Sequence, residues 1–113
     1  MTGLTTHVLD TMHGRPAAGV TLRLLHDGEA LVQAVTNMEG RCDKPLLANG
    51  SLTPGVYRLE FEIGDYFRDL GVPLPDPAFL DTVVIDFGVA EGAAHYHVPL
   101  LVSPFGYSTY RGS

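Results

Sequence analysis

Apolar and polar side chains alternate along several short segments of this chain, and the alternation is clearest in "VYRLEFEI", residues 56–63. One face of this segment carries Tyr57, Leu59, Phe61 and Ile63. The other face carries Arg58, Glu60 and Glu62. Successive side chains of a β-strand point to opposite faces of its sheet, so this pattern predicts a strand with one buried face.

Similar short runs, each bounded by residues typical of turns, predict the other strands. These runs cover residues 4–10, 20–26, 30–37, 81–89, 95–102 and 104–110. Gly and Pro residues fill the turn at 12–19, "DGE" at 27–29 is a hairpin signal, and "MEGR" at 38–41 is a further turn. We therefore expect about seven or eight short strands, as in an antiparallel β-sandwich. A barrel with the same number of strands is the structural alternative.

One segment has the signals of a short helix instead. In "DYFRDLG", residues 65–71, Asp65 is placed as the N-cap and Gly71 lies beyond the helix end. The following "VPLPDPAF" holds three prolines and predicts an extended loop.

Composition fits this all-β fold and narrows the function. A length of 113 residues with 13 Gly and 8 Pro predicts a single domain, residues 1–113, that is rich in turns. The net charge of −6 argues against binding to nucleic acid or to an anionic membrane, and no apolar run is long enough to span a bilayer. Cys42 is the only cysteine, so no internal disulfide can form. No signal peptide is visible, and we expect a cytoplasmic protein, although export to the periplasm is not excluded.

Two histidines on one predicted strand are the main candidates for chemistry. His95 and His97 have the same parity and so point to one side of that strand. With His7 as a third ligand, they are a candidate zinc site with an open position. In a reading without metal, a neutral histidine takes a proton from water, and an arginine such as Arg41 holds an oxyanion or a carbonyl-rich ring. A second histidine, Ser108 and Tyr110 could then orient the water or the ring. Such a set could hydrolyse a cyclic amide or imide.

Three segments together carry a resemblance to a known family. These are "THVLDTMHGRPA" near the start, "TNMEGR" in the middle, and "HYHVPLLVSPFGYSTYRGS" at the end. In this order and spacing they resemble the 5-hydroxyisourate hydrolases, the transthyretin-like enzymes of purine breakdown. The final Tyr-Arg-Gly-Ser is the most specific element, because transthyretin itself lacks that ending and the catalytic histidines.

The resemblance implies a fold, an assembly and a reaction. The fold is a transthyretin-like antiparallel β-sandwich of two four-stranded sheets with one short helix. The assembly is a homotetramer, a dimer of dimers, with active sites at a subunit interface. The reaction is hydrolysis of 5-hydroxyisourate to 2-oxo-4-hydroxy-4-carboxy-5-ureidoimidazoline in urate degradation, with no metal and no cofactor.

The resemblance also assigns roles to particular residues. His7, Arg41, His97 and Ser108 match the catalytic positions of the family, and either histidine could be the general base. Tyr110, Arg111, Gly112 and Ser113 match its substrate-binding end. A carrier that binds a small ligand without catalysis is the main alternative function. A plain interaction domain and a zinc hydrolase are the others.

Overall fold

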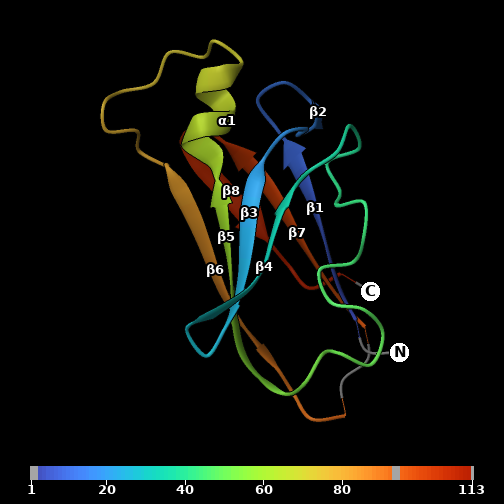
Figure 1. The fold of residues 1–113 in the computed structure, drawn as a ribbon. Helices are drawn as coiled ribbons and strands as arrows, with labels where there is room; N and C mark the ends of the chain where they lie inside the picture. The colour runs from blue at the N-terminus through green and yellow to red at the C-terminus, as the bar shows by residue number, and fades with distance from the viewer. Residues whose placement is uncertain (1–2, 93–94, 113) are drawn as a thin grey trace.

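The computed structural model describes residues 3–92 and 95–112, and it shows two four-stranded β-sheets packed face to face (Figure 1). One sheet has the order β2-β1-β7-β8, with bounds Arg15–Pro16, Leu4–Asp10, Tyr96–Ser103 and Gly106–Thr109. The sheet in front in Figure 1 has the order β4-β3-β5-β6, with bounds Glu29–Val35, Thr21–His26, Gly55–Glu62 and Thr82–Val89. A short helix, α1 (Ile63–Asp69), follows β5. The predicted β-sandwich with one short helix is confirmed.

The pairing of β1 with β7 departs from a purely antiparallel sandwich. These two strands run parallel, whereas the other pairings between the described strands are antiparallel. Their register places Thr5 opposite His97 and His7 opposite Pro99. Because side chains alternate along each strand, this register decides which residues of the two strands share a face.

The hydrophobic core lies between the two sheets and follows the predicted alternation. On β5, Tyr57, Leu59 and Phe61 are buried, as are Leu4 and Val8 on β1. Removing such side chains from water is the main favourable term in folding. The outward residues of β1, including Thr5 and His7, are therefore free to form a site on the opposite side of the sheet.

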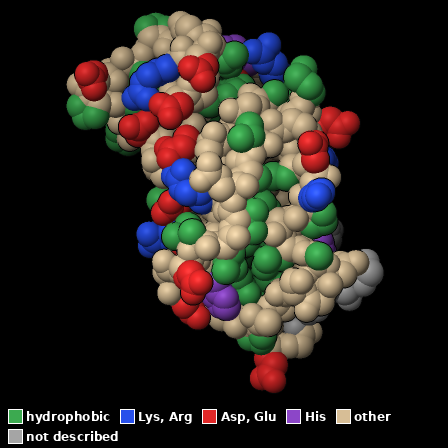
Figure 2. All heavy atoms as spheres, viewed as in Figure 1, with side chains coloured by type: hydrophobic (Ala, Val, Ile, Leu, Met, Phe, Trp, Pro, Cys, Tyr) green, Lys and Arg blue, Asp and Glu red, His purple; other side chains and the backbone are tan. Residues whose placement is uncertain are grey.

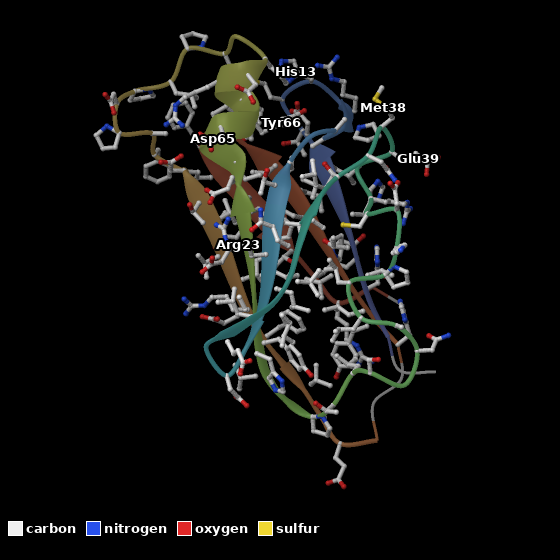
Figure 3. All side chains as sticks on the ribbon, in the orientation of Figure 1. His13, Arg23, Met38, Glu39, Asp65 and Tyr66 are labelled. Carbon is white, nitrogen blue, oxygen red and sulfur yellow. The ribbon has the colours of Figure 1, made fainter. Side chains whose placement is uncertain are left out.

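The outer face of the front sheet carries paired charges beside exposed apolar side chains such as Val56 and Val84. Figure 2 shows Lys and Arg side chains interspersed with Asp and Glu down one side of this view. Arg23, labelled in Figure 3, donates to Glu60 at 3.1 Å and also to Glu62. Arg58 donates to Asp86 at 2.8 Å. Ion pairs that remain in contact with solvent contribute little stability each.

The β3–β4 hairpin forms as predicted from "DGE". Asp27 and Gly28 both have positive φ, at 52° and 81°. Two successive residues in this conformation are typical of the type I′ turn that joins twisted antiparallel strands.

The helix begins two residues earlier than predicted, and Asp65 is not its N-cap. The alternation of β5 continues through Ile63, so the pattern alone does not mark where the strand ends. The amides of Ile63 and Gly64 both donate to the carbonyl oxygen of Asp81 at 2.9 Å, which satisfies them without a side-chain cap. Gly71 lies beyond the helix end, as predicted, with φ of 80°. No helix in residues 3–92 and 95–112 has both the length and the apolar character needed to cross a bilayer.

One strand was missed within the predicted turn at 12–19. Arg15 and Pro16 form β2, which pairs with Asp10 and Leu9 at the end of β1. A two-residue strand is too short to show an alternation, so the sequence pattern predicts only the turn around it.

Candidate active site

Four segments that are far apart in the sequence meet on the outer face of the β2-β1-β7-β8 sheet. His7 on β1 forms an isolated bridge with Arg41, and His97 on β7 forms one with Gly112. Bridged residues are neighbours on the same face of a sheet, and β1 and β7 lie side by side. The structure therefore brings together His7, Arg41, His97 and Gly112, as expected from the sequence.

The orientation of His7 is set by a backbone carbonyl. Its Nε2 lies 2.8 Å from the carbonyl oxygen of Glu39. A carbonyl oxygen only accepts hydrogen bonds, so Nε2 of His7 carries a proton and donates it. Figure 3 shows Glu39 beside Met38 at the turn that follows β4.

The turn is held by the side chain of Asn37, which was not among the predicted site residues. Its Oδ1 accepts from the amides of Glu39 at 2.9 Å and Arg41 at 3.2 Å. Its Nδ2 donates to Asp43 at 3.0 Å. Asn side chains commonly fix turns in this way, and "TNMEGR" holds an Asn three residues before the turn glycine. Asn37 thus positions both the carbonyl that holds His7 and the backbone of Arg41.

Gly40 lets the same turn lie against β1. It has φ of 75°, and a Cβ there would lie 2.4 Å from the carbonyl oxygen of Val8. The amide of Val8 donates to the Gly40 carbonyl at 2.8 Å. Only glycine suits both the positive φ and this close approach.

His97 and His95 are both hydrogen-bonded to the same hydroxyl group, that of Thr5. The Oγ1 of Thr5 lies 2.9 Å from Nδ1 of His97 and 3.0 Å from Nε2 of His95. The two rings therefore point to the same side of β7, as predicted, while Tyr96 and Val98 are buried on the other side. Thr5 was not predicted as a site residue, because a β-branched residue in a strand has no signal of its own.

The pKa of His97 is lowered from its ordinary value. Burial is the main cause, and the charges of Arg41, His7 and His95 act in the same direction. A lowered pKa keeps the imidazole neutral near neutral pH, which is the form that can accept a proton.

The end of the chain packs directly against His97. The amide of Gly112 donates to the His97 carbonyl at 2.7 Å, and a Cβ at Gly112 would lie 2.8 Å from Cδ2 of the His97 ring. Ser108 pairs with Leu101, which has the parity of His97, so Ser108 also lies on the outer face. Tyr110 is 59% exposed. Ser113 lies outside the described residues.

Arg111 does not join this group of residues. Its guanidinium carbon lies 4.0 Å from the centre of the Tyr96 ring, and Tyr96 points away from the side that His97 faces. Arg111 helps to line a crevice of ≈ 260 Å³ with Ile85, Phe87 and Val98. The expectation that two guanidinium groups meet around one cavity is not met by the described chain, in which only Arg41 lies beside His7.

The candidate residues form an open face and not a closed cavity. Arg41 is exposed, and the pocket next to it holds only ≈ 100 Å³. It is lined by Thr5, Thr6, Arg41, Cys42, Lys44 and Leu46. The buried cavity expected from the sequence is therefore not made by one chain alone.

The zinc site that the sequence left open does not form among the described side chains. In residues 3–92 and 95–112, no group of three or more His, Cys, Asp or Glu residues is placed to hold a metal ion. His95 and His97 both direct a ring nitrogen to the Thr5 hydroxyl.

The chain is similar to proteins of one known family. The model of the HIUase/Transthyretin family matches residues 4–112. A protein of Mesorhizobium japonicum named 5-hydroxyisourate hydrolase is 59% identical over 114 residues, which cover 97% of this chain and 91% of that protein.

Solved structures of similar fold include two enzymes. The structure of Klebsiella pneumoniae 5-hydroxyisourate hydrolase has a TM-score of 0.85 and 40% identity, with 100% of both chains covered. The crystal structure of (S)-allantoin synthase has a TM-score of 0.93 and 41% identity. It covers 99% of this chain, but this chain spans only 44% of that longer one.

Proposed function

This chain belongs to the HIUase/Transthyretin family, and we propose that it hydrolyses 5-hydroxyisourate to 2-oxo-4-hydroxy-4-carboxy-5-ureidoimidazoline. The similar proteins named 5-hydroxyisourate hydrolase support the substrate. Residues 1–113 act as one hydrolase domain in this proposal. The observation that carries it is the meeting of His7, Arg41, His97 and Gly112 on one face.

In the proposed reaction, a neutral histidine takes a proton from a water molecule. The water oxygen then bonds to a carbonyl carbon of the substrate ring, and the ring C–N bond breaks. The proton held by the histidine passes to the leaving nitrogen, so no covalent intermediate with the enzyme is needed. General base catalysis of this kind contributes a factor of about 10² to 10⁴.

Arg41 has the complementary role in this mechanism. Its guanidinium stabilises the negative charge that develops on the attacked carbonyl oxygen, since it can donate two parallel hydrogen bonds. His7 and Ser108 lie on the same face and orient the water and the ring. Tyr110, Gly112 and Ser113 are the proposed substrate-binding residues. Arg111, which the resemblance also assigns to the substrate, packs on the Tyr96 ring in the single chain and has no role in this proposal. No metal or cofactor takes part in the proposed reaction.

The open face requires a second subunit to complete the site. Hydrolysis by preorganised charges is strongest where bulk water is excluded, yet Arg41 and Tyr110 are exposed in the single chain. We therefore propose a homotetramer, a dimer of dimers, in which a facing subunit covers this sheet. A single free cysteine fits a reducing compartment, and the proposed location is the cytoplasm.

The proposal is tested with freshly prepared 5-hydroxyisourate. Its ultraviolet absorbance is followed with and without the purified chain, in the presence and absence of a metal chelator. Faster decay that survives the chelator supports the metal-free hydrolase, and decay that is lost with the chelator contradicts it. Tight binding without faster decay identifies the alternative, a carrier of small ligands.

A further inference from the structure

The Thr5 hydroxyl lies between two imidazole rings, and this constrains where their protons are. Oγ1 is 3.0 Å from Nε2 of His95 and 2.9 Å from Nδ1 of His97. A hydroxyl group carries one proton, so it donates to one ring and accepts from the other. The tautomers of the two histidines are therefore coupled through Thr5.

Two arrangements satisfy this geometry when both rings are neutral. In the first, Nε2–H of His95 donates to Thr5, and Thr5 donates to Nδ1 of His97. The proton of His97 is then on Nε2, and that ring has no free nitrogen for water. In the second, Nδ1–H of His97 donates to Thr5, and Thr5 donates to Nε2 of His95. Nε2 of His97 then keeps a free lone pair.

We propose that Thr5 and His95 are positioning residues that hold neutral His97 as the Nδ1–H tautomer, so that its Nε2 takes the proton from the hydrolytic water. This inference rests on the proposed function. Once Nε2 is protonated, both nitrogens of His97 are donors, and Nδ1–H must donate to Thr5. Only the second arrangement accommodates this form without reorienting the hydroxyl, which is the preorganisation that fast proton transfer requires.

The surroundings of His95 are consistent with the second arrangement, in which His95 carries its proton on Nδ1. A Cβ built at Gly3 would lie 3.3 Å from this nitrogen. The same point is 2.9 Å from the Leu47 carbonyl oxygen and 3.2 Å from Oδ1 of Asn49. The three atoms nearest to this point are therefore Nδ1 of His95 and two oxygen atoms, and none of them is an N–H or O–H donor from another residue.

Burial is the main cause that lowers the pKa of His97, and the groups that face it act in the same direction, which favours the neutral ring. His95 comes from β7 itself, His7 from β1, and Arg41 from the turn after β4. Lys44 lines the pocket beside Thr5. A neutral ring depends on its hydrogen-bond partner to select the tautomer, and for His97 that partner is Thr5.

The tautomers can be read directly by nuclear magnetic resonance of the full chain with ¹⁵N-labelled histidine. Spectra are recorded without substrate at about pH 8, where an imidazole of ordinary pKa is neutral. We expect His95 and His97 both to carry their proton on Nδ1, with Nε2 unprotonated. In Thr5→Val, which keeps the β-branched shape without the hydroxyl, His97 shifts towards the Nε2–H form. Thr5→Ser keeps the wild-type tautomers.

Kinetics of the same variants supply an independent readout. Thr5→Val lowers kcat by a factor of about 10 to 100 and leaves KM within about twofold. The substitution affects proton transfer by His97 and leaves substrate binding unchanged. Thr5→Ser recovers most of that loss. Either ring found as the Nε2–H tautomer in the wild type, or a wild-type kcat in Thr5→Val, would overturn the inference. A chain that lacks hydrolase activity but shows both Nδ1–H rings would refute the proposed function and leave the tautomer assignment intact.

Discussion

The backbone amide of Gly112 donates a hydrogen bond to the carbonyl oxygen of His97, with an N···O distance of 2.7 Å. His97 lies near the start of β7, and Gly112 follows β8, the other strand of the same hairpin. A Cβ atom added to Gly112 would lie only 2.8 Å from Cδ2 of the His97 ring. The position of a candidate catalytic ring therefore depends on a glycine at the end of the chain.

This contact predicts that Gly112→Ala displaces the His97 ring and lowers turnover. Real Cβ atoms do not approach ring carbons this closely, so the ring must move, and a displacement of about 1 Å can cost a factor of about 10² in rate. Gly106→Ala is the matched control, since the nearest atom to its Cβ would be Oγ of Ser103 at 3.9 Å. Steady-state turnover and thermal unfolding are measured for both. Equal loss in the two variants would contradict this role of Gly112.

Removal of residues 110–113 is expected to abolish turnover while the sandwich stays folded. The segment supplies the Gly112 contact to His97 and the Arg111 side chain that covers the Tyr96 ring, and its described residues, 110–112, are not part of the buried core. Circular dichroism reports the fold, and 5-hydroxyisourate decay reports activity. A truncated chain with full activity would refute the proposed role of the terminal segment.

Asn37→Ala is expected to lower turnover by a factor of about 10 or more, because it releases the Glu39 and Arg41 amides from the turn. The Glu39 carbonyl then no longer holds His7 in one orientation, and the backbone from which the Arg41 side chain extends is no longer fixed. Asp43→Ala removes the hydrogen bond to Nδ2 of Asn37 but keeps both bonds to its Oδ1, so it serves as the control and should stay close to the wild type. Similar kcat values for Asn37→Ala and the wild type would show that the turn keeps its shape without Asn37.

The sequence predicts which residues share a strand face, but it does not predict how strands are aligned. Alternation correctly placed His95 and His97 together, and the resemblance correctly brought His7 and Arg41 to them. The role of Thr5 depends on the parallel register of β1 with β7, which no local pattern shows. Arg111 differs from Thr5, because alternation from Ser108 and Tyr110 already places it on the opposite face, and only the resemblance assigned it to the site.

The lowered pKa of His97 predicts the pH dependence of the reaction. A general base must be neutral, so kcat/KM falls as the pH drops through the pKa of His97. Burial and the nearby cationic groups place that pKa below the ordinary value of 6.5. We expect the acidic limb of the profile to have its midpoint below 6.5 and His97→Asn to lower kcat by a factor of about 10² or more. A midpoint above 6.5 would contradict the role of His97 as the neutral base.

A buried carboxylate at the end of β1 predicts a different dependence, that of stability on pH. Asp10 is 1% exposed and accepts hydrogen bonds from the amide and Nδ1 of His13 and from the hydroxyl of Tyr66. Burial raises the pKa of Asp10, but these hydrogen bonds outweigh it and hold the pKa below 3.8. Burial is the main cause that raises the pKa of Tyr66 to about 12, and its hydrogen bond to Asp10 acts in the same direction. Asp10 therefore ties the β1–β2 turn to helix α1.

Because the folded-state pKa of Asp10 lies below the unfolded value, its contribution to stability is complete above the unfolded pKa. The contribution is lost as the pH falls through the lower pKa of the folded state. Asp10→Asn should cost about 2 kcal/mol in the free energy of unfolding at neutral pH, because an amide cannot accept from all three donors as a carboxylate does. Urea unfolding of the wild type and Asp10→Asn should show this gap shrinking below about pH 4. Glu91→Gln, at an exposed turn, is the control and should change the free energy of unfolding little at any pH. A difference between wild type and Asp10→Asn that stays constant with pH would show that the charge of Asp10 does not stabilise the fold.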